Sequence, residues 1–287
     1  MVNERSAMKV NTDGVLLGAA MLLTPTDRRL LDIGTGTGTI ALMAAQRLFA
    51  QHDTRSAKDA MTAGGGSVGG CLREQQLLSE ASCDIHIDAI DIDEPSASEA
   101  KANFEQSPWA ANLNAHNLSL DDFAAKLSAL KLQGQDINYD LIFSNPPYFE
   151  ESLTAPDERK STARHTSEGL SYRDIFDFAQ IYLTPKGRVA LVLPADQESA
   201  ICRYARMSDM YLLRVLRIRT VPRKAPSRIV IEFSRQRVAE VVDTVLTIQN
   251  EGQYTQEYLS LTKDFYLFYF LEIAFLAASA MLAASMP

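Results

Sequence analysis

Residues 30–38 constrain the fold more than any other segment of this chain. They read Leu-Leu-Asp-Ile-Gly-Thr-Gly-Thr-Gly, an apolar strand running into a glycine-rich turn, and residues 39–47 continue as a helix. Glycines at a strand-to-helix turn let the backbone approach a ligand closely, at the carboxyl edge of a parallel sheet. The pattern predicts a nucleotide-like ligand in an α/β fold, without identifying the nucleotide.

Asp32, just before the glycines, narrows the choice of ligand. A carboxylate here can face the ammonium of S-adenosylmethionine, whereas beside the pyrophosphate of a dinucleotide it would be repulsive. The alternative is that Asp32 only hydrogen-bonds the amides of its own loop. We therefore expect S-adenosylmethionine, with Asp32 at its amino-acid end.

A second strand, residues 84–93, ends in acidic side chains. An acid that binds ribose hydroxyls normally follows the glycines by about 20 residues, but Asp91 lies 53 residues after Gly38. Residues 52–82 are glycine-rich and weakly periodic, which is typical of a flexible insertion. Without these 31 residues the separation is 22. We assign Asp91 to the ribose and Asp93 to the N-cap of the next helix.

A third apolar strand leads into Asn145-Pro146-Pro147-Tyr148. A planar exocyclic amine is a poor nucleophile until two acceptors take its N–H bonds and direct its lone pair. The Asn145 side-chain oxygen and the Pro146 carbonyl can serve, because proline holds the backbone rigidly and adds no competing donor. The Tyr148 ring offers a stacking face. The motif predicts methylation of an amino nitrogen; the alternative is a simple turn.

The composition fits one α/β enzyme. Of 287 residues, 46% are apolar and 22% charged, which suffices for a full core. Three cysteines without close pairing and four histidines without ligand spacing predict neither a disulfide framework nor a metal site. No signal-peptide pattern opens the sequence, so we expect a cytoplasmic protein. We also expect a monomer.

Charge is unevenly distributed. The net charge is −8, but residues 203–237 sum to +8 and the remainder to −16. A basic stripe on an acidic body suits docking of a phosphate backbone; the alternative is a solvated pair of strands. Our candidates for contact with nucleic acid are Arg159, Arg164, His165, Arg219, Arg223 and Arg228.

Residues 265–286 carry a single charge, Glu272. An apolar run of this length can be a membrane span, but its alanine-rich composition favours a soluble helix because alanine contributes little to insertion. Both interpretations stay open. We place residues 269–287 in a tail outside a domain formed by residues 1–268.

Four segments carry a family resemblance: residues 7–19, 32–38, 145–148 and 260–268. Together they resemble the bacterial tRNA1(Val) adenine-37 N6-methyltransferase family. Asn-Pro-Pro-Tyr is shared by many amino-methylating enzymes, whereas the head Met-Lys-x-x-Thr-Asp-Gly-x-Leu-Leu-Gly is more specific. The resemblance extends from residue 7 to residue 268, apart from the insertion.

The resemblance implies a class I methyltransferase that uses S-adenosylmethionine and methylates an adenine in tRNA, adenine 37 of the anticodon loop of a valine tRNA. By position, the cofactor residues are Thr12, Asp13, Asp32, Gly34, Gly36, Gly38 and Asp91, and residues 145–148 hold the adenine. Two positions depart from the family pattern. Asn11 stands where glycine is more usual, and Ser119 stands where an aspartate contacts the cofactor adenine, with Asp121 as the candidate substitute.

We therefore expect a Rossmann-like, seven-stranded, mostly parallel sheet with helices on both faces and an antiparallel hairpin of residues 211–220 and 227–234. Two alternatives remain. The methyl acceptor could be a protein glutamine or a DNA adenine. The chain could instead be a Rossmann oxidoreductase, or a non-catalytic nucleotide-binding module.

Overall fold

Alternating side chains on the central strands sort into two apolar cores. In β4 (Tyr139–Ser144), Leu141 and Phe143 are buried in one core and Ile142 in the other. Such strands are buried on both faces, as expected for a parallel sheet covered by helices. The computed structural model describes residues 11–63, 84–147 and 169–266.

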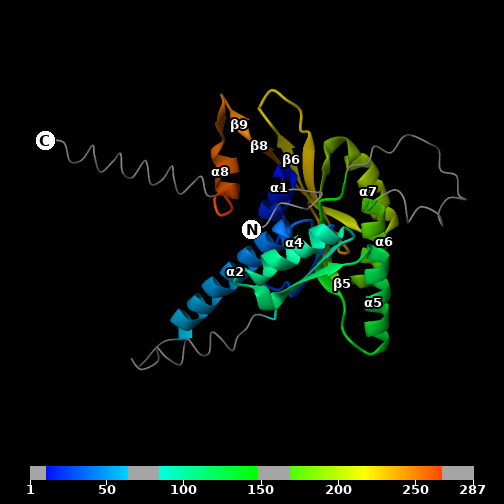
Figure 1. Ribbon diagram of the computed structural model, residues 1–287. Helices are drawn as coiled ribbons and strands as arrows, with labels where there is room; N and C mark the ends of the chain where they lie inside the picture. Colours follow the sequence, from blue (N-terminus) through cyan, green and yellow to red (C-terminus); the bar gives the residue numbers. More distant parts are fainter. Residues whose placement is uncertain (1–10, 64–83, 148–168, 267–287) are drawn as a thin grey trace, which may run out of the picture.

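The elements alternate as a doubly wound fold requires (Figure 1). The helices, including two short 3₁₀ turns, are α1 (Thr12–Ala20), α2 (Thr39–Ala63), α4 (Glu94–Glu105), η1 (Ala110–Asn112), α5 (Leu120–Leu132), α6 (Tyr172–Tyr182), η3 (Ala195–Gln197), α7 (Glu198–Met207) and α8 (Gln256–Thr262). The other strands are β1 (Arg29–Ile33), β2 (His86–Asp91), β3 (Leu113–Asn117), β5 (Leu183–Pro194), β6 (Tyr211–Arg219), β7 (Arg228–Ser234), β8 (Val242–Thr247), β9 (Gln249–Asn250) and β10 (Gln253–Tyr254).

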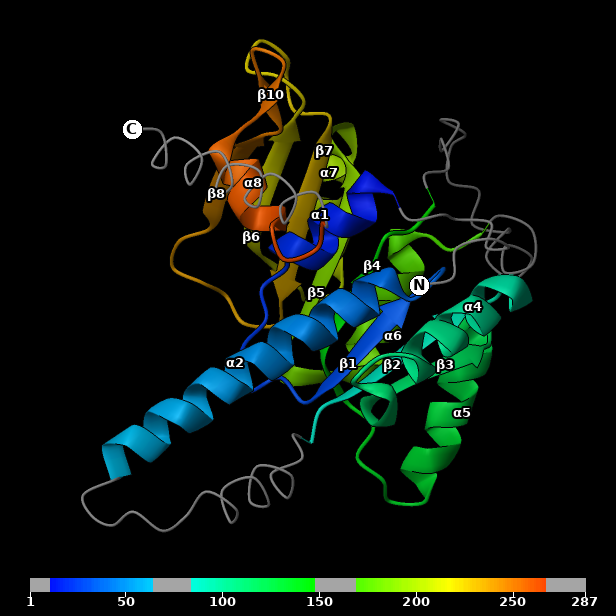
Figure 2. The ribbon, with the colours of Figure 1, turned by 60° about the vertical axis from the view of Figure 1, so that its left-hand side comes forward.

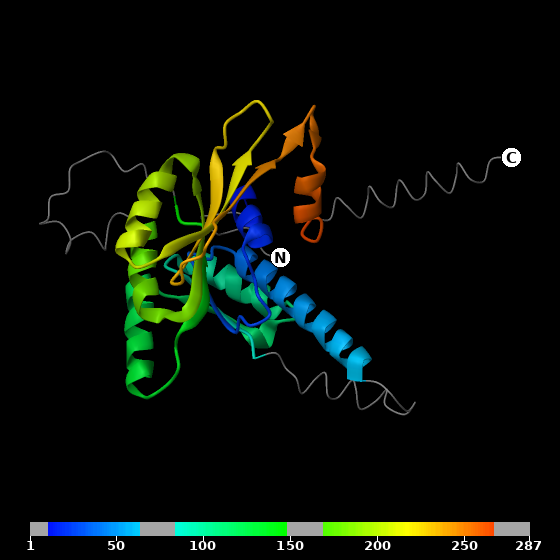
Figure 3. The same cartoon turned by 180° about the vertical axis from the view of Figure 1, so that it is seen from behind.

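The strand order of the main sheet is β3-β2-β1-β4-β5-β7-β6-β8. Helices α5, α6 and α7 pack on one face, while α1, α2, α4 and α8 supply side chains to the core on the other (Figures 1 and 3). The chain leaves β1 toward β2 and later returns to its other side as β4. This reversal is the topological switch point at which doubly wound sheets bind ligands.

The predicted parallel sheet and its final hairpin are confirmed, with β6 and β7 pairing antiparallel within the expected bounds. The main sheet has eight strands rather than seven, because β8 adds in parallel along β6. Of the β8 side chains, Leu246 alone is classed as buried. An edge strand with so little burial leaves almost no apolar alternation in the sequence, so its pattern does not reveal it.

Helix α2 also runs further than expected. It continues to Ala63, beyond residue 52 where we placed the start of the insertion. Figure 2 shows α2 as the longest helix, projecting past the sheet. Residues 64–82, the remainder of the proposed insertion, lie outside the described residues, as does the apolar tail 269–287.

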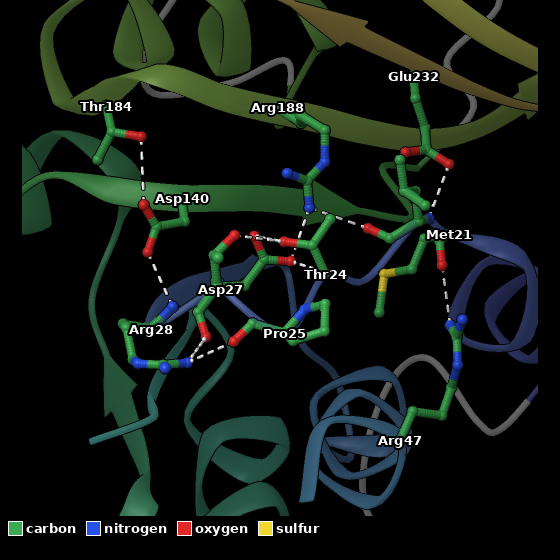
Figure 4. Close-up of polar contacts among 12 residues, drawn as sticks. Met21, Thr24, Pro25, Asp27, Arg28, Arg47, Asp140, Thr184, Arg188 and Glu232 are labelled. Carbon is green, nitrogen blue, oxygen red and sulfur yellow. Dashed lines mark hydrogen bonds and ion pairs between the residues drawn. The ribbon is translucent and has the colours of Figure 1, made fainter. Parts of the chain in front are cut away.

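Helix α1 is anchored at its carboxyl end by three arginines from three different elements. Arg47, Arg188 and Arg214 come from α2, β5 and β6 (Figure 4 labels the first two). Arg47 donates to the carbonyls of Gly18 and Met21 at 2.8 and 2.9 Å, Arg214 to Ala20 at 2.8 Å, and Arg188 to Leu22 at 3.1 Å. Cations at the last carbonyls of a helix satisfy orphan acceptors and complement the helix dipole. The opposite end of α1 is thereby held at the edge of the ligand pocket.

Two buried carboxylates complete this arginine cluster (Figure 4). Glu232, which is 0% exposed, accepts from the Leu22 amide at 3.0 Å and from Arg214 at 3.2 Å. Burial raises the pKa of Glu232, and the nearby arginines oppose that effect. Asp27 bonds Arg188 at 2.7 Å and also accepts from Thr24. The loop between α1 and β1 is thus fixed by ion pairs inside the protein.

Candidate active site

A hollow opens at the carboxyl ends of β1 and β4, where the switch point lies. About 350 Å³ inside it is free of protein atoms, and part of this volume is open solvent. It is lined by Asn11, Gly14, Val15, Gly34, Thr35, Gly36, Thr37, Thr39, Ile40 and Asn145. The glycine turn, the head of α1 and the Asn-Pro-Pro motif therefore meet at one place.

The glycine turn has a conformation that other residues adopt at a cost. Gly34, Gly36 and Gly38 have φ of 70°, 55° and 80°, in the left-handed region that favours glycine. A Cβ on Gly38 would also lie 2.5 Å from the Phe104 ring. The amides of Gly34 and Thr35 donate to the Ile90 carbonyl at 2.9 and 3.0 Å. The turn is held against the end of β2, with the backbone of Gly34 and Gly36 facing the pocket.

Asp32 lies beneath this turn and is 0% exposed. Its Oδ2 accepts from the Thr35 hydroxyl at 2.7 Å, while Oδ1 is buried without a hydrogen-bond partner. Burial raises the pKa of Asp32 to about 7, and the Thr35 bond partly opposes this. Asp32 is not among the lining residues, but its partner Thr35 is. The unsatisfied oxygen is what a cationic ligand would compensate.

Asp91 lies at the end of β2, beside the same turn. Its Oδ2 accepts from the Gly36 amide at 2.8 Å and its Oδ1 from the Asp93 amide at 2.9 Å. Each carboxylate oxygen has a further lone pair, so Asp91 can still accept from hydroxyl groups. Burial raises its pKa. Asp93 caps α4 through a bond from the Ser96 amide at 3.1 Å, so that prediction is confirmed.

Asn145 follows β4 directly and lies in the pocket wall, 6% exposed. The preceding Ser144 donates its hydroxyl to the Ile33 carbonyl at 2.6 Å, which ties the ends of the two central strands together. The Asn145 Nδ2 lies 3.5 Å from the Asn11 Oδ1. Pro146 is buried and Pro147 is exposed. Tyr148 lies outside the described residues.

The head of α1 meets the sheet through Asp13. Its Oδ2 accepts from the Nε of Arg228 at 2.9 Å. Thr12, the first residue of the helix, is exposed at the same end. Arg228 stands at the start of β7, level with Pro194 at the end of β5. The ion pair joins the α1 head to the hairpin half of the sheet at the pocket edge.

Ser119 serves as the N-cap of α5. Its hydroxyl accepts from the Asp122 amide at 3.1 Å and donates to the Asp122 carboxylate at 2.7 Å. Asp121 lies in the first turn of the same helix and is exposed. Neither residue lines the pocket. The Ser119 oxygen already accepts from the Asp122 amide in this cap, whereas the Asp121 carboxylate has more acceptor lone pairs.

Most arginines of the basic stripe are already engaged by other parts of the protein. Arg217 binds Glu198 and Asp243, and Arg214 binds Glu232. Arg235 donates to the carbonyls of Ala179 and Gln180, and Arg237 lies over the Tyr211 ring.

Among the candidate contacts with nucleic acid, Arg219 donates to the Thr247 hydroxyl at 2.8 Å and to the Pro222 carbonyl at 3.0 Å. Arg223 is exposed in the turn between β6 and β7. The sum of +8 overstates the surface charge, because Glu198, Asp243 and Asp13 come from outside residues 203–237. Arg159, Arg164 and His165 lie outside the described residues.

The pocket includes residues to which our sequence reasoning gave no role in the site. Thr35, Thr37 and Thr39 line it, as do Gly14, Val15 and Ile40. The threonines alternate with the glycines of the turn, so the sequence could have indicated that they line the pocket. Ile92, directly after Asp91 at the end of β2, is 76% exposed. The sequence alone gives no measure of this exposure.

Within residues 11–63, 84–147 and 169–266, no helix combines the length and apolarity needed to cross a bilayer. The same residues contain no group of three or more His, Cys, Asp or Glu arranged to hold a metal ion.

Comparison with known proteins identifies the family. No family model matches the chain. A tRNA1(Val) (adenine(37)-N6)-methyltransferase of Parabacteroides distasonis is 35% identical over 92% of this chain and 93% of its own length. A Yersinia pseudotuberculosis protein of the same name is 32% identical over 94% and 90% of the two chains. A crystal structure of a predicted O-methyltransferase from Agrobacterium tumefaciens, 14% identical, superposes with a TM-score of 0.56 over 88% of this chain and 96% of its own, which supports the fold. The chain belongs to the tRNA1(Val) (adenine(37)-N6)-methyltransferase family.

Proposed function

We propose that this protein transfers a methyl group from S-adenosylmethionine to the N6 nitrogen of an adenine in tRNA, adenine 37 in the anticodon loop of a valine tRNA. The observation that carries the proposal is the position of Asn145. It shares one pocket with the glycine turn, so an amine held by Asn145 lies beside a ligand bound along Gly34 and Gly36. The names of the relatives agree with this substrate.

S-adenosylmethionine supplies an electrophilic methyl group on a sulfonium. The site fits this cofactor at two points. The Asp32 carboxylate, which bonds the pocket residue Thr35 and has an Oδ1 without a hydrogen-bond partner, would balance the cofactor's ammonium. The left-handed glycines leave the backbone open where the amino-acid end of the cofactor binds. Asp91 accepts from the ribose hydroxyls through its remaining lone pairs.

The residues after Asp91 would hold the adenine of the cofactor. Ile92, which is 76% exposed, would pack against the adenine ring and lose contact with water there. Asp121 takes the exocyclic amine in place of Ser119, which caps α5. Thr12 and Asp13 close the head of α1 over the cofactor, held by the Asp13–Arg228 ion pair.

Catalysis depends on positioning and on electrostatics at Asn145. Its side-chain oxygen and the Pro146 carbonyl accept from the two N–H groups of the target amine and direct the lone pair toward the methyl group. Pro147 keeps the turn rigid, and Tyr148 stacks on the target base. No strong general base is required, because the amine becomes acidic as it is alkylated. Position 37 lies in a loop, where a base can be splayed out of its stack.

The tRNA docks along the edge of the sheet that carries the pocket. Pro194 of β5 is in register with Arg228, and β5 is parallel to β4, so the β6–β7 turn lies at the same edge as Asn145. Arg223 is the principal phosphate contact of this turn. Arg219 and Arg228 contribute less, because each already donates to a protein group. Arg159, Arg164 and His165, which follow the Asn-Pro-Pro-Tyr motif in sequence, complete the proposed surface.

The remaining assignments come from the sequence. We assign residues 1–268 to one methyltransferase domain interrupted by an insertion, and residues 269–287 to an appended tail. The reaction needs no metal, and the protein acts as a cytoplasmic monomer.

The decisive experiment is methylation of bulk tRNA with labelled S-adenosylmethionine, followed by nucleoside analysis. We expect label in N6-methyladenosine, and in a valine tRNA when isoacceptors are separated. DNA and a glutamine-containing peptide serve as competing acceptors. Label in either of these and none in tRNA would overturn the substrate assignment. Binding of NAD in preference to S-adenosylmethionine would overturn the reaction class.

A further inference from the structure

Asn11 faces two donors at once. Its side-chain oxygen caps α1 by accepting from the Gly14 amide at 2.8 Å, and the Nδ2 of Asn145 lies 3.5 Å from the same oxygen. Both asparagines line the pocket. Asn11 is also the head position at which the sequence departs from the family resemblance, where glycine is more usual.

The cap determines which way both amides point. A backbone N–H can only donate, so the Asn11 atom that faces Gly14 is its oxygen. That oxygen also faces the Asn145 carboxamide and accepts from its nitrogen. A flipped Asn145 would place two oxygens against each other, which is electrostatically unfavourable. The Asn145 nitrogen therefore faces α1, and its oxygen points away from Asn11.

We propose that Asn11 is a positioning residue that selects the productive orientation of the Asn145 carboxamide. This inference rests on the proposed function, in which the Asn145 oxygen accepts from the target amine. A flipped carboxamide would present NH₂ to that amine, which is donor against donor. At 3.5 Å the contact is at the outer limit of a hydrogen bond, so Asn11 acts by excluding the wrong orientation rather than by tight binding.

The anchoring of α1 makes such selection effective. Arg47, Arg188 and Arg214 fix its carboxyl end, and the Asp13–Arg228 ion pair fixes its head. Asn11 is therefore held in place by contacts at both ends of α1. It cannot easily move to accommodate a flipped Asn145 carboxamide. The geometry acts on the rate of methyl transfer, whereas cofactor affinity depends chiefly on the glycine turn and the acids.

The test compares substitutions of Asn11 that keep the cap of α1 but differ in whether the side chain can contact Asn145. Asn11→Ser retains an oxygen suited to the N-cap but is too short to reach Asn145. Asn11→Asp retains both the cap and the second acceptor. Single-turnover methylation of an unmodified valine tRNA transcript should slow about tenfold in Asn11→Ser, less than the 10²–10³ lost on removing a whole transition-state contact. Affinity for S-adenosylmethionine should change less than about twofold, and Asn11→Asp should restore most of the rate.

Two controls distinguish orientation from general damage. Asn138→Ser makes the same change at the opposite end of β4, where the side chain bonds Asp136, and should leave the rate unchanged. In an Asn145→Ala background, Asn11→Ser should cause no further loss, since no amide remains to orient. Thermal unfolding of each variant confirms that the fold is intact.

An Asn11→Ser protein that is folded and as fast as the wild type refutes the inference and leaves the proposed function standing. Equal losses from Asn11→Ser with and without the Asn145 side chain also refute it, because the role is then structural. If the wild-type chain methylates no adenine in the transcript or in bulk tRNA, the proposed function fails, and this inference fails with it.

Discussion

Charged side chains are stabilised differently at the two halves of the sheet. At the carboxyl ends of β1 and β2, Asp32 and Asp91 accept from neutral donors, the Thr35 hydroxyl and the amides of Gly36 and Asp93. In the half formed by β5 to β8, arginines bind carboxylates, as Arg188 binds Asp27 and Arg217 binds Glu198 and Asp243. The first half has acids that can still accept a cation or hydroxyl groups, whereas in the second half Arg188, Arg214 and Arg217 already have carboxylate partners.

The difference indicates which charges serve ligands and which serve the fold. Burial raises the pKa of Asp32 and of Asp91 against the hydrogen bonds that they accept, so each acid gains from a bound cation or donor. An arginine paired with a carboxylate gains little from a phosphate, because it must first leave its partner. The following predictions test this division, from the largest expected effect to the smallest.

Removing an acid from the buried arginine cluster should cost the most stability. Asp27→Ala leaves Arg188, whose side chain is 10% exposed, without its ion-pair partner, and should lower the free energy of unfolding by about 3–5 kcal/mol. Asp243→Ala removes a 52% exposed partner of Arg217 and should cost less than about 1 kcal/mol. Urea denaturation measures both. Equal losses would contradict the view that the two ion pairs differ through burial.

Removing the Asn145 side chain should affect catalysis rather than stability. Asn145→Ala should lower the single-turnover rate of methyl transfer by about 10²–10³, because the lost acceptor acts as the amine changes hybridisation. Affinity for S-adenosylmethionine, measured by calorimetry, should change little by comparison. An unchanged rate in a folded Asn145→Ala protein would remove this residue from the active site.

Prediction from sequence succeeded where the evidence was local. The Leu-Leu-Asp-Ile-Gly-Thr-Gly-Thr-Gly turn, the Asp93 cap and the strand before Asn145 each depend on residues adjacent in the chain, and the structure places them as expected. The sequence did not predict which arginines are already paired, because their partners lie far away in the chain. Asp13 lies 215 residues from Arg228, so no sum of charge over a segment could reveal their pairing. The position of Asn11 likewise depends on how α1 packs against the sheet.

The Asp91 carboxylate should be the next most sensitive group for cofactor binding. Asp91→Ala removes acceptors for two ribose hydroxyls and should weaken S-adenosylmethionine binding by about 1–3 kcal/mol. The same change frees the Gly36 amide. The control is Asp93→Ala, which removes a nearby negative charge from a side chain that caps α4. Equal affinity of Asp91→Ala and wild type would show that Asp91 is not the ribose ligand and that leaving out residues 52–82 was a misinterpretation.

Asp32 predicts a pH dependence of cofactor binding. Its pKa is raised by burial to about 7 in the free protein, and a bound ammonium would lower it. At a pH below the pKa of the bound state, Asp32 is protonated in both the free and the bound protein. At a pH between the pKa values of the two states, cofactor binding releases this proton. Affinity should therefore rise with pH by up to about tenfold per unit as pH approaches 7, and level off above. Calorimetry in buffers of different ionisation enthalpy should detect the released proton near pH 6. Asp32→Asn should abolish both effects; a pH-dependent release that persists in this variant would assign the proton to another group.

The smallest effect concerns the phosphate contacts of the second half. Arg223 is exposed in the β6–β7 turn at the pocket edge, so Arg223→Ala should reduce the log–log salt slope of tRNA binding by about 0.7–0.9. Arg206 is equally classed as exposed but lies near the end of α7, just before β6 begins at the opposite edge. Arg206→Ala should therefore leave the slope unchanged, although both variants lose one positive charge. If the two variants behaved alike, the tRNA would be sensing net charge rather than this edge. If the combined loss of Arg219, Arg223 and Arg228 left the salt slope of tRNA binding unchanged, the basic stripe would be solvated surface and not a tRNA contact.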